Sequence, residues 1–201
     1  MALVGDRYAL RDRQRQALQR CAAGESECRD RRLHEVGETA LTGETVIVDG
    51  YNVLLTVEAA LSGGVLLLAR DGALRDLAAM SAHYRRVHAT RPAIRLLAEF
   101  FTQAACGRIL WYLDRPVSNS DRLRRLIDEE VVACVPPWEV RLVEQVDRAL
   151  SSSSHIVATA DSGILDRCGR WFNLARCVVE RSIPEAWVVD LLGSSADHSD
   201  H

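Results

Sequence analysis

The sequence predicts an α/β fold, in which a mainly parallel central sheet carries helices on both faces. Apolar runs of strand length alternate with segments of helical spacing, which is the pattern of repeated β-α-β units. Three of these runs stop at an aspartate, where a loop begins. Hydrophobic residues make up 48% of the 201 residues, which is enough to bury a sizeable core. Together these observations favour one three-layer α/β/α domain with a smaller attached segment.

The chain is expected to divide into three parts. The residues before the first strand are rich in arginine, the alternating pattern occupies most of the chain, and the last residues are polar. We therefore predict a basic helical segment, an α/β domain and a disordered tail, at residues 1–42, 43–192 and 193–201 respectively.

The N-terminal segment is predicted to contain one helix. Residues 7–23 place apolar side chains on one face and repeated arginines on another. Arg11, Arg13 and Arg15 are candidate contacts to an RNA backbone. A solvated helix face is the commoner explanation of such charge. Residues 24–43 are charged and weakly periodic, so we expect a connector there.

The main strands are predicted from continuous apolar runs, which indicate buried parallel strands when turn residues bound them. They cover residues 46–48, 108–113 and 155–159. The apolar run at 65–69 follows a glycine-containing loop, and Asp71-Gly72 is expected to form a turn after it.

The remaining elements follow from helical spacing, cap residues and short β-branched runs. Helices are expected from residue 73 to about 87, from Pro92 to about 105, from Ser120 as N-cap to about 133, at 145–150, and after Asp161 to 170. Short strands are expected at 138–143 and 177–179, and a loop at 58–64.

The acids that end the three main strands form the candidate functional site. They are Asp49, Asp114 and Asp161. Parallel strands deliver their carboxyl ends to one edge of a sheet, where ligands of α/β proteins bind. Convergent carboxylates repel one another, and a hard divalent cation such as Mg²⁺ or Mn²⁺ relieves that repulsion. If the strands are neighbours, the pattern predicts a metal site that activates water for attack on a phosphodiester.

A simpler explanation exists for each aspartate alone, because an aspartate after a strand often caps the next helix. Three aspartates at corresponding strand ends, together with Asn52 shortly after Asp49, favour the metal site. In the loop after the second strand, Ser118 and Asn119 are candidate phosphate contacts at a helix N-terminus, with Arg115 as a candidate RNA contact beside them. Plain capping is the commoner role for the two polar residues.

Three segments resemble a known family. Val48-Asp49-Gly50-Tyr51-Asn52 is similar to the opening motif of the NYN branch of PIN-like nucleases, a hydrophobic strand followed by Asp-Gly-x-Asn. Val157-Ala158-Thr159-Ala160-Asp161 resembles the late PIN strand that ends in Thr-x-Asp. Tyr112-Leu113-Asp114 falls where that branch carries its middle acid. This resemblance covers roughly residues 44–180.

The whole chain also resembles the uncharacterised bacterial and archaeal proteins classed as DUF434. The resemblance rests on the N-terminal Arg-Gln-Arg helix and on the segment from Leu113 to Ser120.

The PIN-like resemblance implies a metal-dependent RNase fold that prefers single strands. Carried over by position, the metal-site acids would be Asp49, Asp114 and Asp161, with Asn52 as a neighbouring polar orienter. A further acid of the family pattern matches Asp147 best, and Glu144 is the alternative.

These expectations combine into a Mg²⁺- or Mn²⁺-dependent ribonuclease with RNA as its partner. Two alternatives stay open: a catalytically weak PIN-like module that binds RNA or a protein, and a phosphatase that acts on a small molecule. The phosphatase ranks last, because Tyr51 stands where an Asp-x-Asp pattern would need its second acid. The sequence is compatible with a homodimer or with a protein partner.

Composition argues against several other classes. The net charge of −3 gives no global nucleic-acid signature, and genome composition explains the absence of lysine more simply than phosphate binding does. No Cys-x-x-Cys pair indicates a zinc ribbon, and Gly63-Gly64 lacks the context of a P-loop or a dinucleotide fingerprint. With no signal-peptide core and no apolar stretch of the ~20 residues that a membrane span needs, we expect a cytoplasmic protein without a membrane partner.

Overall fold

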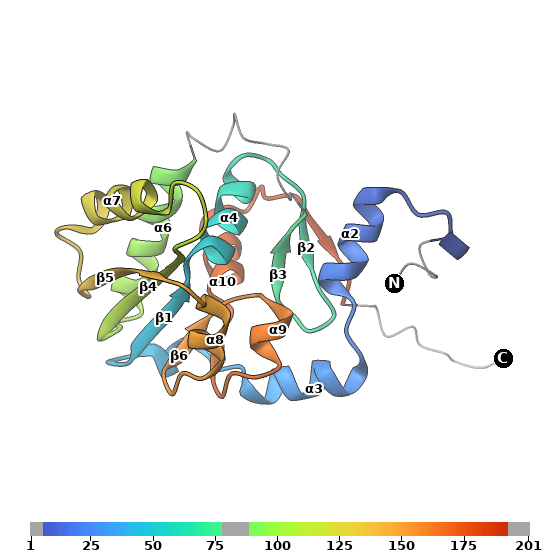
Figure 1. Cartoon of the computed structure of the whole chain (residues 1–201), viewed down its shortest axis with the longest axis horizontal. Helices are drawn as coiled ribbons and strands as arrows, with labels where there is room; N and C mark the ends of the chain where they lie inside the picture. The colour runs from blue at the N-terminus through green and yellow to red at the C-terminus, as the bar shows by residue number, and fades with distance from the viewer. Residues whose placement is uncertain (1–5, 78–88, 193–201) are drawn as a thin grey trace.

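Five parallel strands form the central sheet, in the order β5-β4-β1-β6-β7 (Figure 1). The structure is a computed structural model, and it describes residues 6–77 and 89–192. The strands are β1 (Thr45–Asp49), β4 (Arg108–Asp114), β5 (Trp138–Val143), β6 (Ile156–Ala158) and β7 (Trp171–Phe172). Every pairing between them is parallel. The predicted α/β class with a parallel central sheet is confirmed.

Helices cover both faces of this sheet. One face carries α4 (Gly50–Leu61), α6 (Thr90–Gln103), α7 (Ser120–Val131) and α10 (Leu174–Ser182), and the other carries α8 (Val146–Ser151) and α9 (Ser162–Leu165). Alternate residues of β1 divide between the two cores, because successive side chains of a strand point to opposite faces. Val46 and Val48 pack with the first group of helices, and Ile47 packs with the second.

The chain reverses direction across the sheet between β1 and β6. From β1 it proceeds through β4 to β5 by helices on one face, and then returns to β6 and β7 by helices on the other. In open α/β sheets such a reversal leaves a crevice at the carboxyl ends of the two strands, and ligands bind there. The carboxyl ends of β1 and β6 are therefore the place where this fold is expected to hold a site.

The N-terminal segment contains two α-helices, α2 (Asp12–Cys21) and α3 (Glu25–His34), followed by a 3₁₀ turn, η1 (Glu38–Leu41). The predicted N-terminal helix is confirmed in its central part. The predicted connector is wrong, because residues that read as solvated charge in the sequence form α3. Arg31 of α3 is only 3% exposed, and its charge is compensated by acids far away in the chain.

A second, smaller sheet lies beside the first and consists of β2 (Leu66–Leu68), β3 (Leu74–Asp76) and β8 (Val188–Asp190). β2 pairs with β3 in antiparallel and with β8 in parallel orientation. The helix predicted from residue 73 is therefore wrong at 74–76, where the chain returns along β2 after the Asp71-Gly72 turn. The rest of that prediction, from 78 onward, and the predicted tail at 193–201 lie outside the described residues.

Three other local predictions also differ from the structure. The strand predicted at 177–179 is part of α10, whose buried residues Leu174, Ala175, Val178 and Val179 recur at helical spacing. Helix α4 continues to Leu61, inside the predicted loop at 58–64. The helix predicted to continue to residue 170 ends at Leu165, and β7 begins at Trp171. Among residues 6–77 and 89–192, no helix combines the length and the apolar character that crossing a membrane requires.

Candidate functional site

Asp49 is the last residue of β1, at the carboxyl end of the strand where the chain reverses between β1 and β6, with only 7% of its surface exposed. Helix α4 begins at the next residue, Gly50. A Cβ atom at Gly50 would overlap the Trp111 side chain and the Tyr112 carbonyl oxygen of β4. Glycine is therefore required by close packing of the first turn of α4 against β4. This packing brings Asn52, in the same turn, to the edge of the sheet.

Hydrogen bonds join the end of β1 to the loop after β6. The Thr159 hydroxyl donates to Oδ2 of Asp49 at 2.7 Å and accepts the Asp161 backbone N–H at 3.0 Å. The Ala160 N–H donates to Oδ1 of Asn52 at 2.9 Å. The strand register explains the first contact, since Val48 pairs with Ala158 and the next residues are Asp49 and Thr159. Asn52 thus positions the loop that carries Asp161.

The predicted acids influence one another electrostatically. Burial raises the pKa of Asp49 to about 7. The Thr159 hydrogen bond opposes this shift, whereas the charges of three further acids add to it: Asp161, Asp114 and Asp147. Burial likewise raises the pKa of Asp114, and the charge of Asp147 adds to that rise. The four aspartates therefore form one electrostatic group at this edge of the sheet.

A cleft of about 670 Å³ borders the group on the side of α8. Asp114 and Asp147 line it, and Arg148 and Arg167 are among the other lining residues. Glu144 also lines the cleft, but its carboxylate pairs with Arg115 at 2.9 Å. Of the two candidates for the fourth acid, Asp147 is thus the one whose charge raises the pKa of its neighbours.

The capping explanation holds for one of the three strand-end acids. Oδ1 of Asp161 accepts the N–H groups of Gly163 and Ile164 at 2.8 and 3.1 Å, at the start of α9. Asp49 precedes α4 without a side-chain capping bond. Asp114 ends β4 six residues before α7, and the residue at the N-cap of α7 is Asn119. Capping therefore does not account for Asp49 or Asp114.

The donor atoms suit a hard divalent cation in chemical type, although they do not form a closed ligand set. Among the residues that the structure describes, no three His, Cys, Asp or Glu side chains lie close enough to hold a metal ion directly. Mg²⁺ commonly binds through one or two carboxylates and keeps several waters. One or two of the predicted carboxylates, Asp49, Asp114 and Asp161, could serve in this mode of binding, whereas the three together do not form a direct ligand set.

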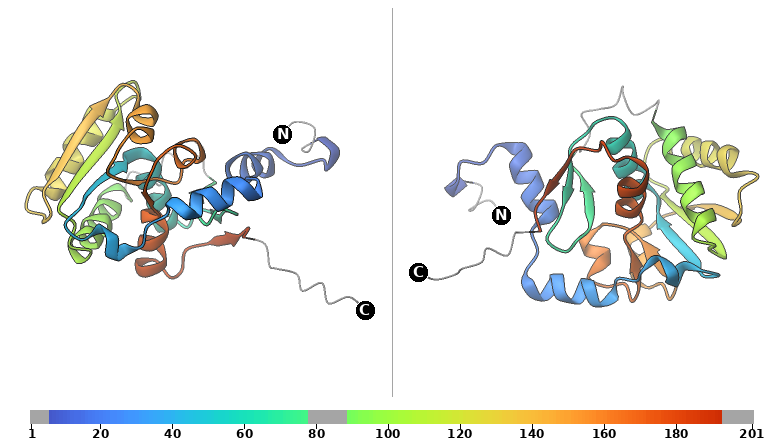
Figure 2. Two further views of the ribbon diagram at one scale, coloured as in Figure 1. Left: turned by 90° about the horizontal axis from the view of Figure 1, so that it is seen from below. Right: turned by 180° about the vertical axis from the view of Figure 1, so that it is seen from behind.

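The predicted N-terminal RNA contacts lie away from this acidic edge. Arg11 and Arg13 are exposed, and Arg15 pairs with Asp6 at 2.9 Å. These residues lie at and within α2, on the opposite side of the molecule from β4 and β5 (Figures 1 and 2). The structure therefore does not bring them together with the aspartates.

The other predicted contacts lie in the loop between β4 and α7. Ser118 and Asn119 are exposed, and Asn119 adopts a left-handed conformation with φ of 71°. The predicted N-cap role of Ser120 is wrong, because Ser120 is the first residue of α7 and its hydroxyl donates to the Asp114 carbonyl at 2.5 Å. The same hydroxyl lies 2.8 Å from that of Tyr51, which links the loop to α4.

Sequence reasoning missed two residues that shape the site. Thr159 could have been found, because a threonine two positions before an acid at the end of a buried strand has few partners other than the neighbouring strand's acid. Arg75 gave no signal: its Nε donates to the Ala160 carbonyl at 2.7 Å, across 85 positions of sequence.

Comparisons with known proteins find families without an assigned function. Residues 1–33 match the model described as Protein of unknown function (DUF434), which confirms the predicted resemblance for that segment. An uncharacterised protein of Methanocaldococcus jannaschii is 33% identical over 123 residues, which cover 61% of this chain and 58% of that protein. The chain thus spans less than two thirds of this relative's length. The PIN-like resemblance stays a prediction.

No solved structure matches the chain. Residues 38–177 match a second family model, and this segment spans more than half of the 201 residues. The protein therefore belongs to the family described as Domain of unknown function (DUF5616).

Proposed function

We propose that this protein is a Mg²⁺- or Mn²⁺-dependent ribonuclease whose site is the acidic edge formed by Asp49, Asp114, Asp147 and Asp161. One observation carries the proposal: the pKa of Asp49 is raised to about 7, first by burial and then by the charges of the other three acids. Shifted carboxyl groups at a ligand crevice are typical of functional sites. A bound cation would supply the charge that lets these carboxylates ionise together and would activate water.

The chain's own residues have distinct roles in this proposal. Asp49, Asp114 and Asp161 would hold the cation partly through its bound waters, and Asp147 would contribute from the cleft. Thr159 keeps Asp49 oriented, and Asn52 holds the loop before Asp161. Arg148 and Arg167 line the cleft beside the acids, where a guanidinium suits a phosphate of an RNA strand.

The proposal is tested by incubating the protein with labelled single-stranded RNA in the presence of Mn²⁺. Asp49→Asn should abolish cleavage, and a chelator should do the same to the wild-type protein. Asp128→Asn is the matched control, because Asp128 is an exposed aspartate that pairs with Arg124 within α7. It should cleave at the wild-type rate. Equal cleavage by wild type and Asp49→Asn, or by neither, would contradict the nuclease.

A second function is supported by a different observation. Because no three candidate ligands among the described residues lie close enough to hold a metal directly, a catalytically weak module that binds RNA or a protein is the alternative. The arginines of the N-terminal segment would then supply the affinity, which falls with added salt. This alternative predicts RNA binding that survives Asp49→Asn and weakens when Arg11, Arg13 and Arg15 are replaced together by glutamine.

A further inference from the structure

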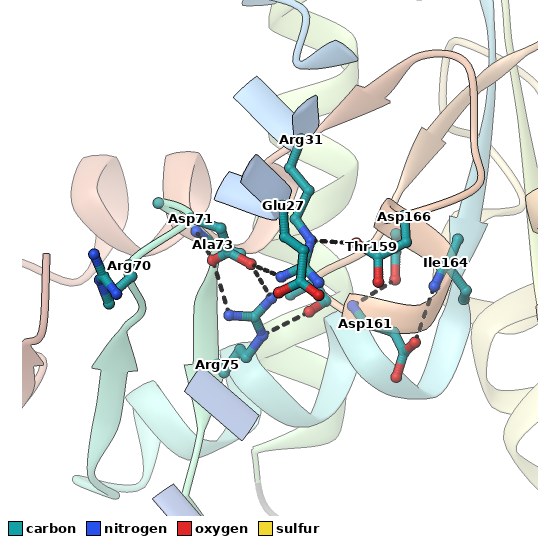
Figure 3. A network of polar contacts seen from close by, with 12 residues as sticks. Glu27, Arg31, Arg70, Asp71, Ala73, Arg75, Thr159, Asp161, Ile164 and Asp166 are labelled. Carbon is teal, nitrogen blue, oxygen red and sulfur yellow. Dashed lines mark hydrogen bonds and ion pairs between the residues drawn. The ribbon is translucent and has the colours of Figure 1, made fainter. Parts of the chain in front are cut away.

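A buried ion network joins the N-terminal segment to the turn between β2 and β3 (Figure 3). Asp71 in this turn is fully buried, and both of its carboxylate oxygens accept hydrogen bonds from the guanidinium of Arg75, at 2.9 and 2.7 Å. Arg31 of α3 donates to the same carboxylate at 2.6 Å and, through Nε, to Asp166 at 2.7 Å. Two arginines and two aspartates thus balance their charges.

Arg75 also extends this network to the candidate site. Its Nε donates to the Ala160 carbonyl at 2.7 Å, while the Ala160 N–H donates to Asn52. Ala160 stands between Thr159, which holds Asp49, and Asp161. The backbone of Ala160 is therefore held at its N–H by Asn52 of α4 and at its carbonyl by Arg75.

The arginine side chain is suited to this task by its geometry. A guanidinium presents its donors in a rigid fork, so the two bonds to Asp71 fix the direction in which Nε points. A lysine could supply the charge, but its three donors share one nitrogen on a flexible stem and cannot reach both Asp71 oxygens and the Ala160 carbonyl in this fixed planar arrangement. Arg31 shares the Asp71 carboxylate, and the Trp171 indole N–H bonds the Arg31 carbonyl at 2.7 Å. This bond holds helix α3 against β7, while the Arg31 side chain points into the ion network.

We propose that Arg75 is a positioning residue for the loop Thr159–Asp161, and that Arg31 holds it in place through Asp71. The two segments that match separate family models, residues 1–33 and 38–177, would then build one site together. The consequence for metal or RNA binding rests on the proposed ribonuclease function. The positioning of the loop does not depend on that function and can be measured without it.

The test is amide hydrogen exchange of the full-length Arg75→Lys variant, followed by NMR without metal. Loss of the Nε bond should speed exchange of the Ala160 and Asp161 amides by about tenfold relative to amides in the middle of β1, because the loop opens locally. If Arg75→Lys does not fold, Arg31→Lys is measured in the same way. Exchange of the Ala160 and Asp161 amides should also be faster in this variant, because Arg31 is bound to the carboxylate that orients Arg75.

Leu74→Ala is the matched control. Leu74 precedes Arg75 in β3 and is 2% exposed, so its truncation destabilises the same hairpin through lost packing and spares the ion network. Exchange should accelerate in the hairpin and the core, without a selective effect at Ala160 and Asp161. An unchanged ratio of loop to β1 exchange in the arginine variants, or an equal change in Leu74→Ala, would overturn the positioning role.

Mn²⁺ titration separates this inference from the proposed function. If the wild-type protein binds Mn²⁺, Arg75→Lys should weaken the affinity several-fold, whereas Leu74→Ala should leave it unchanged in conditions where both are folded. Unchanged affinity in Arg75→Lys would overturn the link to the site. If the wild-type protein neither binds Mn²⁺ nor cleaves RNA, the ribonuclease proposal fails, and the exchange ratios alone decide whether Arg75 positions the loop.

Discussion

Two buried aspartates of this protein, Asp71 and Asp49, are in opposite electrostatic situations. Burial works to raise the pKa of Asp71, but the hydrogen bond and charge of Arg75 and the hydrogen bond of Arg31 hold that pKa below its ordinary value. Burial, together with the charges of nearby acids, raises the pKa of Asp49 to about 7. Asp71 is 0% exposed and Asp49 is 7% exposed, so burial does not distinguish them.

The difference lies in the partners that the fold supplies to each carboxylate. A buried charge with paired and directed counter-charges has a structural role, because removing one partner leaves the other as an uncompensated buried charge. A buried carboxyl group surrounded by other acids costs stability when it ionises, and proteins tolerate such an arrangement mainly where chemistry requires it. The Asp71 network is therefore interpreted as structural support, and the Asp49 group as the site that it supports.

The largest expected effect comes from breaking the compensated network at its centre. Asp71→Asn removes the carboxylate that Arg31 and Arg75 share and leaves two buried guanidinium groups with too little negative charge. We expect a loss of about 3–5 kcal/mol in the free energy of unfolding, as for other broken buried pairs. Urea denaturation measures it. Asp166→Asn, at the more exposed end of the network, should cost less, and a loss below about 1 kcal/mol for Asp71→Asn would contradict the assignment.

The second effect has the opposite sign. The folded-state pKa of Asp49, about 7, exceeds the ordinary value of 3.8, so the folded protein binds the proton more tightly and loses stability as pH rises from about 4 to about 7. Asp49→Asn does not ionise and therefore does not lose this stability, and its amide oxygen can still accept the hydrogen bond from the Thr159 hydroxyl. Without divalent metal at pH 8, it should be more stable than the wild-type protein by on the order of 2 kcal/mol. The gap should close as pH falls toward 4.

Denaturation across this pH range checks the prediction, with Asp128→Asn as the control that should show no such pH-dependent gap. A wild-type protein as stable as Asp49→Asn at pH 8 would mean that Asp49 ionises at its ordinary pKa. The contrast with Asp71 would then be lost.

The third effect is the response of the acidic group to metal. A carboxylate must be deprotonated to bind a cation, so Mn²⁺ affinity should fall by about tenfold for each pH unit below the pKa of Asp49. Calorimetric titrations at pH 6, 7 and 8 measure this, with pH-dependent proton release as a second readout. Affinity that stays constant over this range would show that Mn²⁺ binds without Asp49.

The smallest effect is expected from an exposed ion pair near the same cleft. The side chains of Arg115 and Glu144 are 58% and 68% exposed, and solvent screens their interaction. Arg115→Ala should therefore change the free energy of unfolding by less than about 1 kcal/mol. A larger loss in thermal unfolding would place this pair with the Asp71 network.

The sequence predicted the parts of the fold that depend on local pattern. The runs that became β1, β4 and β6 are continuously apolar because both faces of the sheet are covered, so their position and their terminal acids were visible. The predictions at 74–76 and 177–179 were wrong because these stretches are short. A buried three-residue strand and one face of a helix can share the same few apolar residues.

Only the part of the candidate site that lies at or near strand ends could be predicted from the sequence. Asp49, Asp114, Asp147 and Asp161 were named from sequence, and the structure couples all four electrostatically. Arg75 and Arg31 could not be found in the same way. Each lies in a stretch whose local pattern suggests a surface charge, and their partners stand up to 135 positions away.

The strand β8 bears on how this protein can be shortened. Its pairing with β2 is framed by bonds from the Leu66 N–H to the Trp187 carbonyl and from the Leu191 N–H to the Leu68 carbonyl, at 2.9 and 2.8 Å. All of β8 lies beyond the family match, which ends at residue 177 inside α10. A fragment cut to that match would expose the unpaired edge of β2, and such edges recruit other chains. We expect such a fragment to aggregate, whereas one kept to residue 192 keeps β2 paired with β8.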